Sequence, residues 1–221
     1  MTTSGTTIFD LSIDDAIEEA FERCGIVVSS GYQLKSARRS LNLLFLDWAN
    51  RGLNLWTIEQ KTFALTQGDA AITLDSDTVN VLSAVIRDTS SGTQQDITID
   101  RISREEYLNI PDKTTQARPA QFYVERANTF KVYLYPASNT TYTFVYYRIR
   151  RIEDAGSYTN TADVNFRFLP CLVSGLAYFL SLKFSPERTI ALKTMYEEDF
   201  TRAALEDRDT ASVSFVPDFG A

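Results

Sequence analysis

Histidine is absent from this sequence of 221 residues. The chain therefore lacks the usual general base at neutral pH, the commonest nitrogen ligand of metals, and any Ser-His or Cys-His nucleophile pair. Cysteine is scarce, because only Cys24 and Cys171 occur, far apart and in apolar surroundings. They could pair, but two such thiols in a protein made in a cytoplasm are more often small buried hydrophobes.

Glycine is also sparse, and its nine positions form neither GxxxxGK nor GxGxxG, the two common phosphate-binding patterns. Neighbouring carboxylates occur at Asp14–Asp15, Glu105–Glu106 and Glu197–Asp199, and such pairs can supply the acid and base of a glycosidase. Each of them falls on the polar face of an expected helix, where solvated carboxylates are ordinary. The sequence thus predicts no catalytic residues, no cofactor and no metal site, and we expect a protein that is not an enzyme.

Long apolar runs and basic segments are missing as well. The longest apolar stretch, FLPCLVSGLAYFLSL, is interrupted by Pro170 and by polar residues, so no run approaches the ~20 residues of a membrane span. The first ten residues carry no basic start and no apolar core of a signal peptide, which indicates synthesis in a cytoplasm. The net charge of −7 argues against a partner recognised through its phosphates, such as DNA read by sequence.

The spacing of apolar residues changes twice along the chain. Residues 11–24 and 32–51 carry them at helical spacing, with a capping box at Ser12 and Asp15 and Gly25 placed to end the first helix. The second helix has an unusually broad apolar stripe, which predicts burial on more than one side. That stripe comprises Leu34, Ala37, Leu41, Leu44, Phe45 and Trp48, widened by Leu43, Leu46 and Ala49, before Gly52 ends the helix.

Between Leu55 and Arg151 the alternation has period two, in short segments rich in Val, Ile, Thr, Tyr and Phe, which predicts strands. A hairpin turn is expected around Ala127 and Asn128, and one short helix is expected after Ser103. From about residue 164 the helical period returns with a helix that is apolar nearly all round. A last helix follows, with Ser185 as its cap and Pro186 at its first position.

This order predicts an α+β fold: a helical bundle formed by the N- and C-terminal helices, with an inserted antiparallel β-domain and an extended C-terminal tail. The expected boundaries are 1–54 and 161–209 for the two parts of the bundle, 55–160 for the β-domain with its short helix, and 210–221 for the tail.

Three features are candidates for binding. The basic cluster Arg148, Arg150 and Arg151 could contact phosphate or carboxylates of a neighbouring subunit, although a solvated strand edge explains it at least as well. Alternation places Arg148 and Arg150 on one strand face. The aromatic residues of the β-region could form a stacking platform, but cross-strand and core packing is the more usual role.

The third candidate is the C-terminal tail, which is apolar without having a helical or strand period. It either packs back on its own domain or is a docking segment ordered by a partner, and we favour the partner. Its apolar residues are Val213, Phe215, Val216 and Phe219.

Several of these segments together resemble the head-to-tail adaptor proteins of short-tailed bacteriophages. The N-terminal helix pair resembles that family in its LN–x5–W–x3–G pattern, here Leu41, Asn42, Trp48 and Gly52, with Trp56 following. Later matching positions are Pro119, Tyr123, Pro136 and Tyr147 in the β-region and Leu176, Ala177, Tyr196 and Ala203–Ala204 in the closing helix pair. The likeness spans residues 10–209, and its order and spacing are more specific than any single motif.

The resemblance implies a structural protein of the virion, synthesised in the host cytoplasm. Such adaptors form a ring, usually of twelve copies, beneath the portal protein, where they extend the DNA channel and offer a platform to a tail nozzle or tail-tube protein. DNA passes through without sequence-specific binding, and no membrane is involved. The tail would bind the portal. The wide part of the apolar stripe, around Leu43 and Leu46, would provide a face for other helices or for the next subunit.

Other functions remain open at this stage. Within the same class, the chain could be a tail-tube or nozzle component. In different classes, it could be a tail-associated cell-wall hydrolase using a carboxylate pair, or a glycan-binding module using the aromatic β-region.

Overall fold

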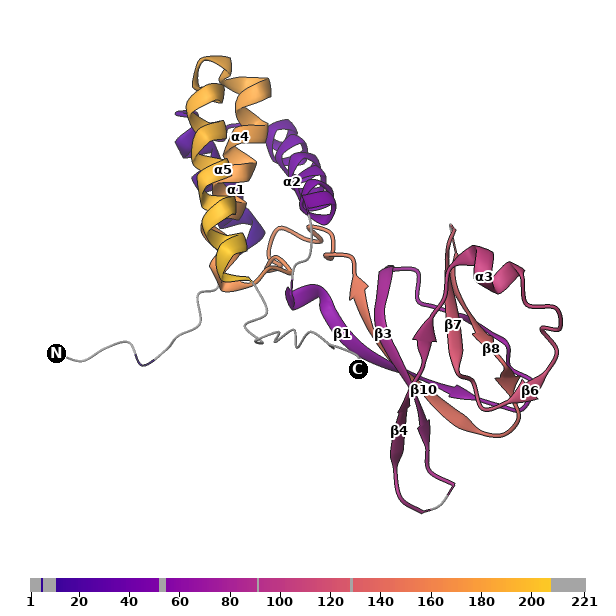
Figure 1. Cartoon of the computed structure of the whole chain (residues 1–221). Helices are drawn as coiled ribbons and strands as arrows, with labels where there is room; N and C mark the ends of the chain where they lie inside the picture. Colours follow the sequence, from indigo (N-terminus) through magenta and orange to yellow (C-terminus); the bar gives the residue numbers. More distant parts are fainter. Residues whose placement is uncertain (1–4, 6–10, 52–54, 91, 128, 208–221) are drawn as a thin grey trace, which may run out of the picture. The chain divides into compact units, whose positions relative to one another are not determined.

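The computed structural model describes residues 5, 11–51, 55–90, 92–127 and 129–207. The chain divides into two compact units, and each is described by itself. The helical unit comprises Met1–Leu55 and Ile152–Ala221, and the strand unit comprises Trp56–Arg151. The combination of helices with largely antiparallel sheets confirms the α+β prediction, whereas the expected tail at 210–221 lies outside the described residues (Figure 1).

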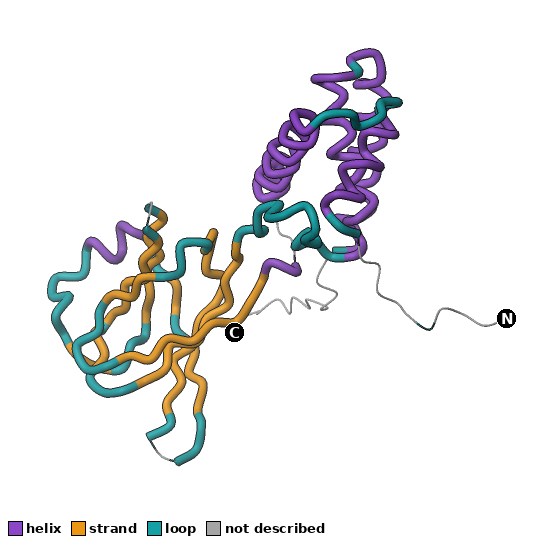
Figure 2. Tube along the Cα trace, turned by 180° about the vertical axis from the view of Figure 1, so that it is seen from behind, coloured by secondary structure: helices purple, strands orange, loops and turns teal. Residues whose placement is uncertain are grey.

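The helices of the helical unit come from both ends of the described chain (Figures 1 and 2). In chain order they are α1 (Ile13–Arg23), α2 (Gly31–Arg51), the 3-10 turn η2 (Phe166–Phe168), α4 (Leu169–Phe184), the 3-10 turn η3 (Pro186–Arg188) and α5 (Thr189–Glu206). Helix α4 is central, because α1, α2 and α5 all pack against it. This position explains why α4 is apolar nearly all round.

Helix α4 has a composition that a membrane span could also have. The segment Phe166–Phe184 is 19 residues long with a mean hydropathy of 1.3, enough by length and composition to cross a membrane. The length of uninterrupted apolar runs in the sequence had not predicted a segment of this length and hydropathy. In the helical unit 56% of the most apolar 18-residue window of this segment is buried, as expected for a helix at the centre of a bundle.

The capping signals in the sequence correspond to real helix ends. The Ser12 hydroxyl accepts from the Asp15 amide over 3.1 Å, and the Asp15 carboxylate accepts from the Ser12 amide, which forms the predicted capping box. Gly25 ends α1 with φ +73°, a conformation that favours glycine. The prediction at Ser185 was wrong in detail, because the turn η3 intervenes there and α5 begins at Thr189.

The predicted second buried face of α2 is not covered by the helical unit itself. In the stripe, Leu41, Leu44 and Trp48 are 0% exposed, but Leu43 and Leu46 are 53% and 57% exposed. The helical period identifies which residues share a face, but only tertiary packing decides whether that face is covered.

A chain of polar side chains joins α2 to α5 beside this core. Trp48 Nε1 donates to Tyr196 Oη over 3.0 Å, and Tyr196 Oη donates to Asp47 Oδ2 over 3.0 Å. Arg51 donates to both carboxylate oxygens of Glu197, over 2.7 and 3.0 Å, and lies 4.9 Å from the Tyr196 ring centre. The hydrogen bond from Arg51 lowers the pKa of Glu197, and burial raises the pKa of Tyr196. The α2–α5 contact is therefore specified by directional bonds as well as by apolar packing.

Gly175 of α4 lies where a side chain would not fit. A Cβ there would be 2.9 Å from Leu44 Cδ1 and 2.9 Å from Tyr196 Cε2. We therefore expect Gly175→Ala to destabilise the helical unit by about 1–3 kcal/mol through overpacking, measured by chemical denaturation followed by circular dichroism. Gly31→Ala is the control, because no atom lies within 4 Å of the Cβ position at Gly31. Equal stability of the two variants would contradict close helix packing at Gly175.

The strand unit contains two four-stranded sheets, in the orders β1-β10-β3-β4 and β2-β8-β7-β5, and a short β6-β9 pair. Its elements are the turn η1 (Leu55–Thr57), β1 (Ile58–Leu65), β2 (Ala71–Thr73), β3 (Thr78–Asp88), β4 (Gln95–Thr98), β5 (Asp100–Arg101), α3 (Arg104–Leu108), β6 (Gln116–Ala117), β7 (Gln121–Arg126), β8 (Phe130–Tyr135), β9 (Ala137–Ser138) and β10 (Tyr142–Arg150). Pairing is antiparallel except for β5-β7 and β6-β9. The β7-β8 hairpin confirms the predicted turn, of which Asn128 lies outside the described residues.

Several aromatic residues of the strand unit lie in one apolar core shared by both large sheets, although Phe63 and Tyr147 are exposed. Phe122 of β7 and Phe144 of β10 are 2% and 0% exposed, with ring centres 6.4 Å apart. A smaller group of rings forms where Tyr107 of α3 lies 5.5 Å from Tyr123 and 5.3 Å from Tyr133. These contacts account for the aromatic pattern by packing.

Candidate functional site

Arg148 is the most deeply placed member of the basic cluster. It is 2% exposed, and its guanidinium forms a bidentate pair with Asp77, over 2.6 and 2.9 Å. Its Nε donates to Glu59 over 2.7 Å, its Nη1 donates to Thr78 Oγ1 over 2.6 Å, and its Nη2 lies 2.5 Å from Glu59 Oε1. Each of the three guanidinium nitrogens of Arg148 therefore lies within hydrogen-bond distance of carboxylate or hydroxyl oxygens of the strand unit.

This site arises from strand register. Antiparallel pairing of β1 with β10 places Glu59 opposite Arg148, while irregularities between β10 and β3 interrupt the pairing beside Arg148 and again beside Arg150. Burial alone would lower the pKa of Arg148, but its hydrogen bonds to Asp77 and Glu59 raise it. Burial likewise would raise the pKa of Asp77, and the bonds from Arg148 lower it. The arrangement therefore stabilises both the positive charge of Arg148 and the negative charge of Asp77.

The other two arginines occupy different surroundings. Arg150 is half-buried, and its Nη1 donates to the carbonyl of Arg151 over 3.1 Å. Arg151 is exposed, and its amide donates to the Asp77 carbonyl over 2.8 Å. The structure thus places the three arginines close together along the chain but gives Arg148 a role inside the strand unit.

The predicted docking residues of the tail lie outside the described residues. They are Val213, Phe215, Val216 and Phe219.

The neighbouring carboxylates have structural partners. Asp15 and Glu106 each complete a capping box, at the start of α1 and of α3. Glu197 is paired with Arg51, and Asp199 is paired with Arg202. These contacts give Asp15, Glu106, Glu197 and Asp199 structural roles in helix capping and ion pairing.

The part of the chain that the structure describes contains neither a metal-binding site nor a reactive thiol site. There, no group of three or more His, Cys, Asp or Glu side chains could hold a metal ion. Cys24 and Cys171 are both free and buried, as expected from the sequence. Burial raises the pKa of each thiol, which disfavours the reactive thiolate.

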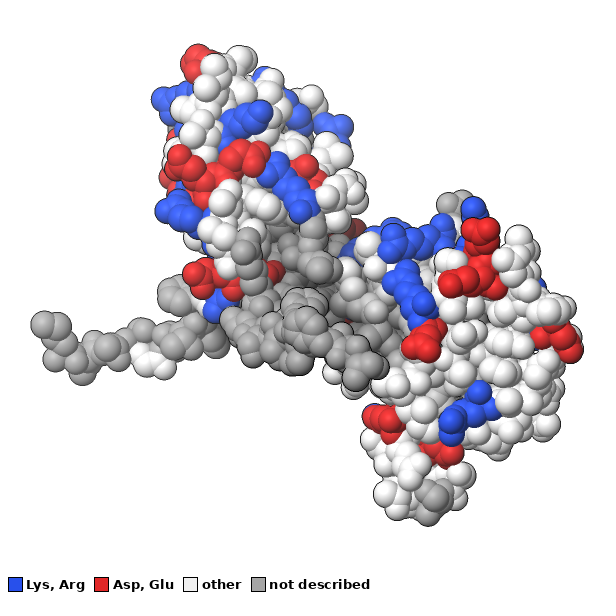
Figure 3. Space-filling view, in the orientation of Figure 1, with Lys and Arg blue, Asp and Glu red and all other residues white. Residues whose placement is uncertain are grey.

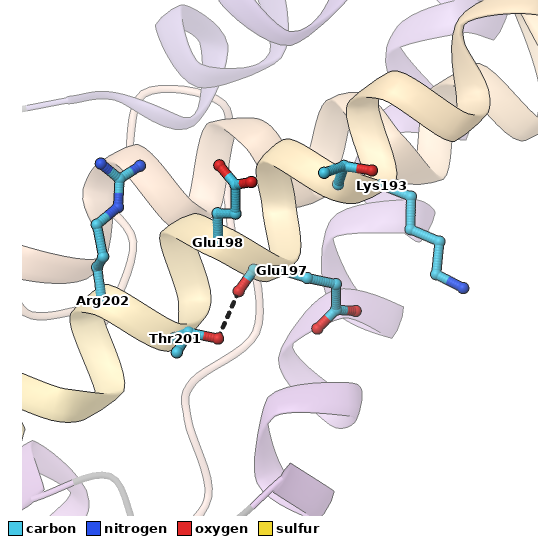
Figure 4. Close-up of a pocket in the computed structure, with 6 residues that line it drawn as sticks. Lys193, Glu197, Glu198, Thr201 and Arg202 are labelled. Atoms are coloured by element: carbon cyan, nitrogen blue, oxygen red, sulfur yellow. Dashed lines mark hydrogen bonds between the residues drawn. The ribbon is translucent and has the colours of Figure 1, made fainter.

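An open groove of about 650 Å³ runs along α5 in the described part of the helical unit. Figure 4 shows charged side chains that spread from the helix, with Lys193 and Glu197 on one side and Glu198 on the other. Thr201 donates its hydroxyl to the Glu197 carbonyl over 2.7 Å, as the dashed line marks. Because the groove has no buried polar group converging on one point, it has the form of a contact surface rather than of a catalytic cleft.

Charge is mixed over the surface as well. In Figure 3 the basic and acidic side chains are interspersed over the visible face of both units. Such a face does not create the continuous positive field that phosphate-driven nucleic-acid binding requires.

The comparisons with known proteins agree with a structural role. A family model described as SU10 adaptor protein matches residues 28–218, which is most of the chain. No curated protein matches the sequence. The matched range includes the strand unit, the helical unit from α2 onward, and three of the four apolar residues of the tail, Val213, Phe215 and Val216. The chain belongs to the SU10 adaptor protein family and is a bacteriophage adaptor, a structural component of the virion.

Proposed function

We propose that this adaptor forms a ring, of twelve copies, beneath the portal protein of the virion. There it extends the DNA channel and provides the platform to which a nozzle or tail-tube protein attaches. The observation that carries the proposal is the family match, because it runs through both units and into the tail. The chain would be made in the host cytoplasm and then incorporated at the head-to-tail connection.

The proposed activity is binding without catalysis. Many copies that each make a modest contact sum to a large avidity, because the portal is itself a ring. The net charge of −7 suits a channel through which DNA slides without sequence-specific binding. Arg150 and Arg151 remain our candidates for contacts with a neighbouring subunit or with phosphate, whereas Arg148 would first have to leave its carboxylate partners.

The tail is the proposed portal-docking segment. Its four apolar residues, Val213, Phe215, Val216 and Phe219, would insert into a groove on the portal ring as an extended segment. A segment that orders only on contact costs conformational entropy, which keeps the affinity of a free copy low. We therefore expect the purified protein to be monomeric, or nearly so, until the portal templates the ring.

Deleting residues 212–221 tests this role. We expect the truncated protein to lose binding to the portal ring in co-sedimentation, because the apolar anchors are removed. Its helical content should not change, because the cores of both units lie upstream. A double variant, Ser212→Ala with Ser214→Ala, is the matched control, since it keeps the four apolar residues. Undiminished binding of the truncated protein would overturn the proposed role of the tail.

A further inference from the structure

Helix α2 carries an outward seam that its own unit leaves uncovered. The seam repeats at intervals of three and four residues, like one side of a coiled coil. Its members are Tyr32, Lys35, Arg39, Leu43 and Leu46. Tyr32 is 67% exposed, and the two leucines are more than half exposed. The seam is basic in its first half and apolar in its second.

The charge of this seam is unbalanced. Helix α2 carries four basic residues, Lys35, Arg38, Arg39 and Arg51, and a single acidic one, Asp47. Within the described ranges, Lys35 and Arg39 have no ion-pair or hydrogen-bond partner for their side chains. Lys183 of α4 lies nearby and adds to the positive charge, and its pKa is lowered by burial and then by Arg39. A partner for this seam should therefore be acidic.

Helix α1 of the same unit has the opposite character. It carries five acidic residues, Asp14, Asp15, Glu18, Glu19 and Glu22, and one basic residue, Arg23. Asp14, Glu18 and Glu22 follow each other at intervals of four along its exposed side. We call this row, together with the exposed apolar residues Val27 and Ile190 beside its end, the acidic face.

The acidic face ends in two strongly exposed apolar side chains. Val27, just beyond the end of α1, is 85% exposed, and Ile190, in the first turn of α5, is 83% exposed. Arg188 donates to the Arg23 carbonyl over 3.1 Å, which joins the start of α5 to the end of α1. Along the chain, the acidic row of α1 is thus followed by the exposed Val27, as the basic half of the α2 seam is followed by Leu43 and Leu46.

The two surfaces do not satisfy each other within one copy. Both helices pack on α4, and Figure 1 shows α2 beside α4 and α1 behind it. Among the described residues, no ion pair joins the acidic row of α1 to Lys35 or Arg39 of α2, so each copy keeps both a basic–apolar surface and an acidic–apolar surface.

We propose that a second copy of this chain docks head to tail, with the α2 seam of one copy on the acidic face of the next. Such a contact is heterologous, so each added copy leaves one surface of each kind open, and repetition produces a ring or a filament. The inference deepens the proposed ring and rests on it for the biological setting. It adds the polarity of the ring and the surfaces that form it.

The contact should be weak and sensitive to salt. Each exposed ion pair contributes little to the free energy of binding, and such pairs speed the encounter of two partners more than they hold them together. A weak contact between free copies fits a ring that assembles on a template. It also predicts association only at high protein concentration and low ionic strength, where screening is small.

A charge-swap experiment tests the proposal. One variant carries Lys35→Glu and Arg39→Glu in the seam, and the other carries Glu18→Lys and Glu22→Lys in the acidic face. We expect the wild type to associate in sedimentation velocity between micromolar and millimolar concentration at low salt. For each variant alone, the association constant should fall at least tenfold, because like charges then face each other across the contact. An equimolar mixture should restore it, because the swapped surfaces complement each other.

Controls separate this interface from other effects. Arg104→Glu with Arg126→Glu makes the same change of net charge as the seam variant, on exposed residues of the strand unit, and it should leave association unchanged. A wild type that stays monomeric throughout, single variants that still associate, or a mixture that fails to recover would each overturn the proposal. Portal binding through the tail is measured on the same proteins. If portal binding persists while the mixture of charge-swapped variants does not associate, the proposed interface is wrong and the proposed function stands.

Discussion

Replacing Trp48 by alanine is expected to lower the free energy of unfolding of the helical unit by about 3–5 kcal/mol. Trp48 is 0% exposed, and its ring lies 5.6 Å from that of Phe168 and 6.3 Å from that of Phe200, centre to centre. The substitution removes these contacts, leaves a cavity beside α4, and deletes the hydrogen bond to Tyr196. Chemical denaturation followed by far-ultraviolet circular dichroism measures the effect, because the helical unit supplies most of the helical signal.

Two further variants show where this stability comes from. Leu46→Ala on the same helix is the matched control, and since Leu46 is 57% exposed we expect it to change stability by less than about 0.5 kcal/mol. Trp48→Phe keeps most of the apolar contact but removes the indole donor, so its cost should fall between the two. A Trp48→Ala loss below about 1 kcal/mol would show that α2 is not held by this core.

Arg148→Ala should produce the second large effect, a loss of about 3 kcal/mol from the strand unit. The change removes a buried guanidinium that bridges β1, β10 and the start of β3, and it leaves Asp77, Glu59 and Thr78 without their shared donor. Asp77 and Glu59 are partly exposed, so water reduces the penalty of the unpaired carboxylates. Hydrogen exchange at β1 and β10 amides measures the loss locally.

Two substitutions separate charge from geometry at this site. Arg148→Lys retains the charge but cannot form the bidentate pair, and it should recover only part of the stability. Arg126→Ala, at an exposed position of the same unit, should have little effect. Unchanged exchange rates in Arg148→Ala would contradict a structural role and return Arg148 to the candidates for subunit or phosphate contact.

Local signals in the sequence predicted several elements well. The capping boxes at Ser12 and Ser103 involve residues three apart, so the side chains that define the helix start are visible in the sequence. The alternation between Leu55 and Arg151 predicted the strands for a similar reason, since both sheets bury one face of each long strand in a shared core.

Features that depend on distant residues were harder to predict. Alternation placed Arg148 with Arg150 on one face, but it contained no information on the irregular pairing with β3 or on the carboxylate of Asp77, 71 residues away. The bond from Trp48 to Tyr196 joins positions 148 apart and was missed, although both residues had been noted. The exposure of Leu43 was missed because periodicity does not show what covers a face.

Electron microscopy of the virion tests the central claim most directly. We predict density for this chain as a closed ring of twelve copies between the portal and the tail, coaxial with the DNA channel. Density for the chain at the far end of the tail, or as isolated copies without a ring, would contradict the proposed function.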